Sequence, residues 1–129
     1  MAELRAEGDQ LVLALTSREH IYSLSRDLSA PLSAVRRVWV PAIPWLVLRG
    51  WRSAGVAVPG KVALGSRRHG DGWDFTAIHG GEEAVVVELV GQRYAQWLVG
   101  VADAGGTGAA VSAAAGVAFD PTPVTYEPR

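Results

Sequence analysis

The segment Gly55 to Val62, GVAVPGKV, has the spacing of a nucleotide-binding P-loop: a glycine, four residues, then glycine and lysine. A working P-loop also follows a buried strand, opens a helix, and carries serine or threonine after its lysine to hold magnesium. Here Val62 follows Lys61, and the residues beyond are typical of a strand. Pro59 also lacks the backbone N–H that a phosphate cradle needs. We therefore interpret the segment as a loop that leads into a strand.

The histidines are the next candidates, for acid–base or metal chemistry. His69 and Asp71 form a His-x-Asp pair in one expected turn, and His79 borders the next turn. Two potential ligands on a turn are too few for a closed metal site, so we expect no metal and no cofactor. The chain also has no cysteine and no G-x-S-x-G nucleophile pattern, and we expect no enzymatic activity. One alternative stays open, a small-molecule-binding barrel or minor enzyme that uses His69, Asp71 and His79.

Positive charge gathers in the middle of the chain. Residues 28–70 carry a net charge of +7 without one acid, whereas residues 1–27 carry −2 and residues 71–129 carry −6, so the whole chain has a formal net charge of −1. Cations without interspersed acids raise a local positive potential wherever the fold brings them together. An anionic protein surface or lipid headgroup is therefore the expected partner. The acidic second half argues against nucleic acid.

Tryptophans accompany these cations. Trp45 and Trp51 lie in expected loops, and Trp51 is flanked by Arg49 and Arg52. Arginine beside tryptophan can form cation–π contacts, which suits a binding surface. The other three tryptophans lie in expected strands and are assigned to the core. The hypothetical ligand-binding surface consists of Arg49, Trp51, Arg52, Lys61, Arg67 and Arg68.

The elements that would position these residues are mostly strands. Apolar, β-branched or alternating runs predict strands at residues 3–7, 10–15, 28–31, 34–40, 61–66, 73–79, 84–90 and 94–101. The turns HGDG, HGGEE and GQR between the last four predict an antiparallel meander. Thr16 and Glu19 fit a capping box that opens a short helix over Ser17 to Ser25. A C-terminal helix is expected from Thr107, as its N-cap, to about Val117, while residues 50–60 are expected to be a loop.

These elements predict a mainly β fold with a short early helix and a C-terminal helix, class α+β. We expect one domain over residues 1–119 and a proline-containing, extended tail over residues 120–129. The N-terminus lacks the apolar core of a signal peptide, and no apolar run is long enough to span a bilayer. A cytoplasmic protein without a transmembrane segment is therefore expected; whether it forms a homo-oligomer stays open.

Several motifs are similar to those of an uncharacterised family of small actinobacterial proteins. They are P-L-x-x-V-R-x-V from Pro31 to Val38, Arg49-Gly50 followed by Pro59-Gly60, D-F-x-A from Asp74 to Ala77, and AVVVEL over residues 84–89. The resemblance covers about residues 3–103. It implies a bacterial fold like that of pleckstrin-homology (PH) domains, a strongly bent seven-stranded barrel or split barrel capped by a C-terminal helix. It brings no catalytic residues, and PH-like folds bind lipids, peptides and proteins alike.

Overall fold

A computed structural model describes residues 2–16, 19 and 27–125 of the chain. The described residues form two β-sheets, one α-helix and two short 3-10 helices. The smaller sheet is antiparallel, in the order β1-β2-β3: β1 (Glu3–Glu7), β2 (Gln10–Ala14) and β3 (Leu28–Pro31). The larger sheet has the order β4-β8-β9-β7-β6-β5: β4 (Val35–Trp39), β5 (Trp51–Val58), β6 (Val62–His69), β7 (Gly72–His79), β8 (Glu83–Leu89) and β9 (Gln96–Val101). The mainly β, α+β class predicted from the sequence is confirmed.

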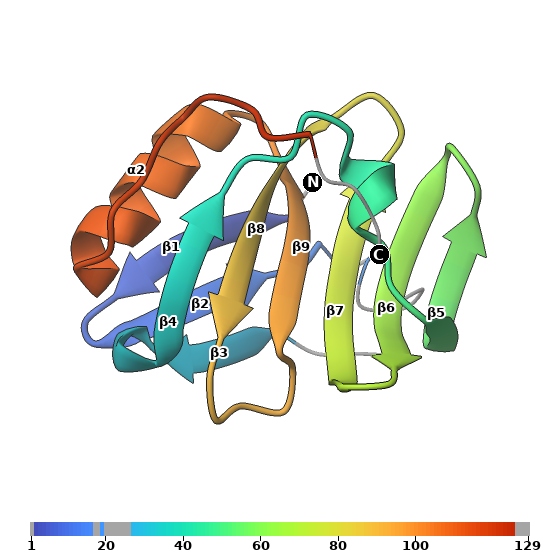
Figure 1. The fold of residues 1–129 in the computed structure, drawn as a ribbon, viewed down its shortest axis with the longest axis horizontal. Helices are drawn as coiled ribbons and strands as arrows, with labels where there is room; N and C mark the ends of the chain where they lie inside the picture. The colour runs from blue at the N-terminus through green and yellow to red at the C-terminus, as the bar shows by residue number, and fades with distance from the viewer. Residues whose placement is uncertain (1, 17–18, 20–26, 126–129) are drawn as a thin grey trace.

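The two sheets face each other, and the C-terminal helix α2 (Ala104–Ala115) packs beside them, against β1, β4, β8 and β9 (Figure 1). The main apolar core lies between them. Alternation within the strands supplies it, since side chains two residues apart share a face. Leu11 and Leu13 enter it from β2, and Val85, Val87 and Leu89 enter it from β8. These inward faces agree with the pattern in the sequence.

A second, smaller apolar cluster covers the opposite face of the large sheet. Ile78, Val86 and Leu98 point outward from neighbouring strands, and Val47 of the 3-10 helix η2 (Pro44–Val47) packs on them. Because apolar residues cover both faces, every residue of β9 is buried. A strand that is apolar on both faces is stabilised by a central place in its sheet.

That burial explains why the predicted meander is wrong. β9 is inserted between β7 and β8, and it pairs with β7 in parallel, with Phe75 opposite Trp97 and Ala77 opposite Val99. A meander would instead have placed β8 beside β7. β9 would then have been the outermost of these strands, with β8 as its only neighbour. The large sheet is consequently mixed, with one parallel pair among antiparallel ones.

The loop predicted over residues 50–60 is also wrong, because most of it is strand β5. Its partner is β6, and Gly55 lies opposite Gly65. Gly55 has a φ of 106°, and a side chain there would overlap the carbonyl of Leu64. The glycines therefore permit a close approach of the two strands instead of breaking the strand. The P-loop-like segment is thus a β-hairpin that turns at Pro59 to Lys61.

The two helix predictions have different outcomes. The capping box is present, since the Thr16 N–H donates to Glu19 Oε1 (2.9 Å) and the Glu19 N–H donates to Thr16 Oγ1 (3.2 Å). The remainder of the predicted early helix, Ser17 to Ser25, lies outside the described residues apart from Glu19. The C-terminal helix is confirmed but begins earlier, because Asp103 is its N-cap and accepts from the Gly106 N–H at 3.0 Å. Thr107 lies inside the helix.

The described part of the tail returns to the domain. The Ala42 N–H donates to the Val124 carbonyl and the Val124 N–H donates to the Val40 carbonyl, both at 2.8 Å. Val124 and Pro41 therefore form an isolated parallel bridge beyond the end of β4. Within the described residues, no helix combines the length and apolar composition needed to cross a membrane.

Candidate binding surface at the β5–β6 end

Pairing in the large sheet lines up one polar residue from each of its six strands. The partners run in register across the sheet, so their side chains share its outer face, the one opposite the main core. We call this set the polar row: Arg37, Glu88, Gln96, Asp74, Arg67 and Arg52, in order from β4 to β5. Val86 and Leu98, which belong to the smaller apolar cluster on the outer face, lie two residues away from Glu88 and Gln96 along the same strands. The polar row is therefore the border between a covered apolar surface and the rest of the outer face.

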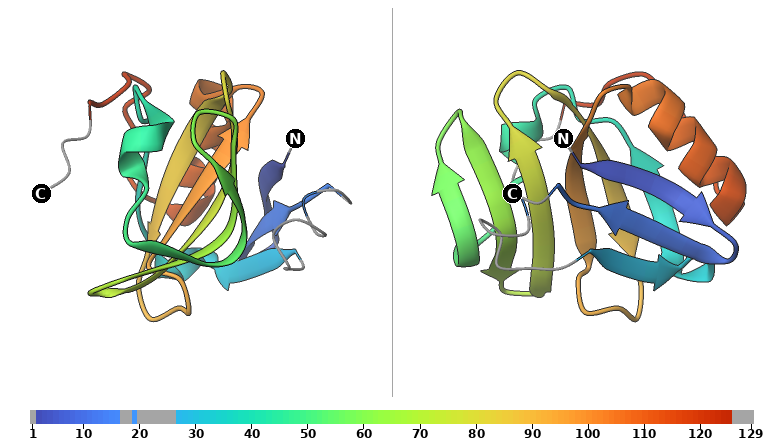
Figure 2. Two further views of the ribbon diagram at one scale, coloured as in Figure 1. Left: turned by 90° about the vertical axis from the view of Figure 1, so that its right-hand side faces the viewer. Right: turned by 180° about the vertical axis from the view of Figure 1, so that it is seen from behind.

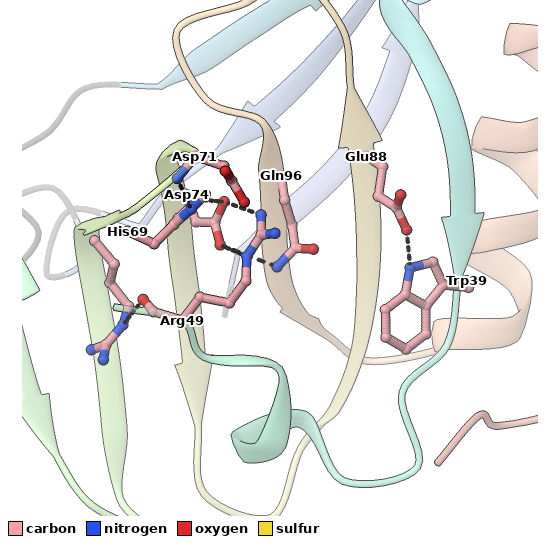
Figure 3. Close-up of polar contacts among 8 residues, drawn as sticks. Trp39, Arg49, His69, Asp71, Asp74, Glu88 and Gln96 are labelled. Carbon is pink, nitrogen blue, oxygen red and sulfur yellow. Dashed lines mark hydrogen bonds and ion pairs between the residues drawn. The ribbon is translucent and has the colours of Figure 1, made fainter. Parts of the chain in front are cut away.

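Asp74 is the centre of the polar row. Its carboxylate is 1% exposed and accepts two bonds from Arg49, from Nε to Oδ2 at 2.7 Å and from Nη2 to Oδ1 at 2.6 Å (Figure 3). Gln96 donates to Oδ2 at 3.4 Å, and His69 Nε2 lies 3.0 Å from Oδ1. A bidentate arginine pair is among the stronger polar contacts in proteins. It fixes the end of the 40–50 segment onto β7.

The protonation pattern of His69 follows from its two contacts. Its Nδ1 accepts the Asp71 backbone N–H at 3.2 Å, so the proton of the neutral ring lies on Nε2 and is donated to Asp74. Both ring nitrogens are occupied, and only 8% of the side chain is exposed. His69 consequently positions the β6–β7 turn. Among the described residues, no three histidine or acidic side chains gather in a way that could hold a metal ion.

At the other end of the polar row, Glu88 is shared between two residues of β4. Trp39 Nε1 donates to Glu88 Oε2 at 2.8 Å (Figure 3). Arg37 Nη1 lies 3.4 Å from the same oxygen. The Arg37 guanidinium also lies over the Trp39 ring, 5.2 Å from its centroid. Arg37 and Arg49 are therefore both paired with acids from the second half of the chain. The fold thus neutralises part of the basic block that the sequence segregates.

Two cations at the β5 end of the polar row lie beside each other. Arg52 and Arg67 are cross-strand partners, and neither forms an ion pair with an acid within the part of the chain that the structure describes. Arg67 is held in place, since its Nε donates to the Arg49 carbonyl at 3.2 Å and its Nη2 donates to the Gly50 carbonyl at 2.9 Å. Burial lowers the pKa of Arg67, Asp74 opposes that change, and the like charge of Arg52 adds to it.

The inner face of the same hairpin carries a second row. Trp51, Arg68 and Trp73 are register partners on β5, β6 and β7. The Arg68 guanidinium lies over the Trp73 ring, 5.5 Å from its centroid, while Trp51 is 77% exposed. Cations therefore occur on both faces of this ribbon end, and the exposed Trp51 ring lies with Arg68 on the inner face. We call Trp51, Arg52, Arg67 and Arg68 the basic end.

The structure brings together four of the six residues predicted for the binding surface. Arg49 is adjacent to them, but its charge is directed at Asp74. Lys61 lies in the turn at the far end of the hairpin, about 20 Å away along a strand of this length. The pair His69 and Asp71 is likewise separated by the length of β7 from His79, whose Nε2 lies 3.2 Å from Glu19 Oε2.

Sequence reasoning missed Asp74, Glu88 and Gln96. Each is a polar residue on the outer face of a mostly apolar strand, and each neighbours an inward-facing aromatic or aliphatic residue. That alternation was a usable signal for a polar outer position. The hydrogen-bond partner of each residue could not be predicted from the sequence, because it depends on the order of strands in the sheet.

Comparison with known proteins adds no relative. No protein-family model matches the sequence, and no curated protein or solved structure matches it.

Proposed function

We propose that this chain is a non-catalytic, PH-like binding domain of the bacterial cytoplasm whose basic end binds an anionic protein. Two sheets facing each other with a C-terminal helix beside them support the PH-like part. The nine strands of the described residues and the parallel β7–β9 pair depart from a seven-stranded barrel.

The observation that carries the proposal is the pairing of Arg52 with Arg67 at an exposed sheet edge. Two like charges side by side, one of them partly desolvated, raise the free energy of the unbound protein. An anion placed between them removes that repulsion. Arg67 is also held by two carbonyl acceptors, so little side-chain entropy is lost when it binds. The site is thus preorganised for a carboxylate or another oxyanion.

The magnitudes favour a protein over a lipid surface. Each cation near an anionic membrane contributes about 1 kcal/mol, so the three arginines of the basic end would contribute about 3 kcal/mol. That corresponds to a dissociation constant in the range of about 1–10 mM. Charge alone therefore gives weak membrane association. A protein partner can add backbone and apolar contacts, for which Trp51 is available.

The alternative role in small-molecule or enzyme chemistry receives less support. His69 has both ring nitrogens engaged, and Asp71 lies on an exposed turn. His79 lies at the opposite end of β7 and is bonded to Glu19. The three side chains therefore do not converge on one substrate position, which general acid–base catalysis requires.

The proposal is tested by binding of fluorescently labelled polyglutamate, with anionic and neutral vesicles assayed in parallel. Arg52→Gln should weaken polyglutamate binding by about tenfold, the effect of losing about 1.4 kcal/mol. Arg36→Gln is the matched control, because Arg36 is an exposed arginine on β4 at the opposite edge of the sheet. Raising the salt concentration should weaken binding of the wild type more than that of Arg52→Gln.

Equal losses in Arg52→Gln and Arg36→Gln would mean that only overall charge matters, and the basic end would then not be the site. Binding to anionic vesicles alone, again dependent on Arg52, would replace the protein partner by a lipid headgroup.

A further inference from the structure

Strand β5 is an open edge of the large sheet. It pairs with β6 on one side, and no strand of the described residues pairs with it on the other (Figures 1 and 2). An unpaired edge presents backbone N–H and C=O groups that an extended chain can bond. The residues at its start, Trp51 and Arg52, are both exposed.

The basic end has its cations on two opposite faces of this edge. Arg52 and Arg67 lie on the outer face, whereas Arg68 lies on the inner face beside Trp51. A partner that lies flat on either face can reach only one of these sets. A chain that runs along the β5 edge reaches both, because successive side chains of an extended chain point to opposite faces.

The same edge is built against pairing with a second copy of itself. The register between β5 and β6 shifts between Arg52 and Ala54, which marks a bulge, and Gly55 follows with its φ of 106°. Bulges and such glycines interrupt an edge, so a partner strand can pair with a short part of β5 but not with its whole length, as the eight-residue β5 of a second copy would. A second copy of β5, whose sequence WRSAGVAV contains no acid, would bring no counter-charge to Arg52 and Arg67, whereas an acidic segment would neutralise them.

We propose that the partner segment is an extended acidic strand that lies along β5 and carries two consecutive acidic residues. One carboxylate bonds Arg52 and Arg67 on the outer face, and the next bonds Arg68 on the inner face next to Trp51. Main-chain hydrogen bonds to the β5 edge supply affinity, and the two carboxylates set the register. This inference rests on the proposed function, and it narrows the anionic protein partner to one conformation and one charge pattern.

The test compares three synthetic peptides of alternating threonine and valine, by fluorescence anisotropy with the full chain. The first has two adjacent glutamates at its centre. The second has the same composition, but one residue separates its two glutamates, so that both point to the same face of a strand. The third repeats the first with its backbone amides N-methylated at alternate positions, which preserves charge and removes strand pairing.

We expect the first peptide to bind about tenfold more tightly than either of the others, the equivalent of about 1.4 kcal/mol. Arg68→Gln should abolish the advantage of the first peptide over the second, because it removes the inner-face cation. Arg36→Gln should leave that advantage unchanged. Arg68 is exposed and its contact is a ring face, so the variant is expected to fold.

The two proposals fail in different ways. If all three peptides bind equally and Arg52→Gln weakens all of them, the basic end binds anions but the strand geometry is overturned. If none binds and polyglutamate does not bind either, the proposed function itself is overturned, and this inference with it.

Discussion

Asp74 makes more polar contacts than any other side chain of the polar row. It receives two bonds from Arg49 and one each from His69 and Gln96, all within a buried position. These contacts join the 40–50 segment, the β6–β7 turn and β9 at a single carboxylate. A buried carboxylate in such a network stabilises the fold only while its partners are present, because each partner would otherwise lose its acceptor.

Asp74→Asn should reduce the free energy of unfolding by about 2–3 kcal/mol, since it removes the buried negative charge to which Arg49 donates two hydrogen bonds. Chemical denaturation would measure the loss as a lower midpoint at an unchanged m-value. Asp71→Asn is the matched control. This variant changes a residue three positions away that contacts His69 through its backbone N–H and not through its carboxylate. It should shift the free energy of unfolding by less than about 0.5 kcal/mol. A similar loss in both variants would show that Asp74 holds no network.

At the scale of the elements, α2 shows how glycines can serve packing within a helix that they weaken. The helix contains Gly105, Gly106 and Gly108, each unfavourable by roughly 1 kcal/mol relative to alanine. A side chain at Gly108 would overlap the ring of Phe119, which folds back onto the helix from the segment after it. At Gly105 the nearest atoms lie 3.8 Å away or more, an ordinary van der Waals distance. Packing against Phe119 thus requires the glycine at Gly108, whereas Gly105 has room for a side chain.

The two positions predict opposite results for the same substitution. Gly105→Ala should stabilise the protein by about 0.5–1 kcal/mol through helix propensity. Gly108→Ala should destabilise it by about 1–2 kcal/mol, because the cost of displacing the Phe119 ring exceeds the same gain in helix propensity. Thermal unfolding of the two variants beside the wild type would measure both effects. An increase in stability at both positions would mean that Phe119 does not pack on Gly108 in solution.

At the scale of the whole molecule, the order of strands decides where the structure is most and least protected. β9 lies in the centre of the large sheet and is buried on both faces, whereas β5 is an edge strand with no buried residue among its described side chains. Two residues of the basic end, Trp51 and Arg52, therefore lie on the least protected strand of their sheet. Binding sites commonly lie in regions of low local stability, where a partner can order the backbone it contacts.

Native-state hydrogen exchange should follow this order. The amides of Leu98 and Val99 should exchange only when the whole domain unfolds, while those of Val56 and Ala57 should exchange by local opening. The acidic peptide with adjacent glutamates should slow exchange in β5 and leave β9 unchanged. Protection that is uniform along β5 and β9 before any peptide is added would contradict the edge assignment.

The sequence alone determined the local features of this protein. Period-two alternation in residues such as Val85 and Val87 set which side chains face the core, and the Thr16–Glu19 spacing identified the capping box. The concentration of cations in residues 28–70 was equally visible. All of these depend on neighbours in the chain, whose geometry is nearly the same in any fold that contains a strand or a helix start there.

Only the tertiary structure decided which distant residues meet. The insertion of β9 beside β7 placed Gln96 against Asp74, and the close approach at Gly55 made a strand of an expected loop. The same strand order directed Arg37 and Arg49 to acids and left Arg52 beside Arg67. Strand order depends on the burial of both faces of each strand against all the others, a property of the whole sheet that no local pattern encodes.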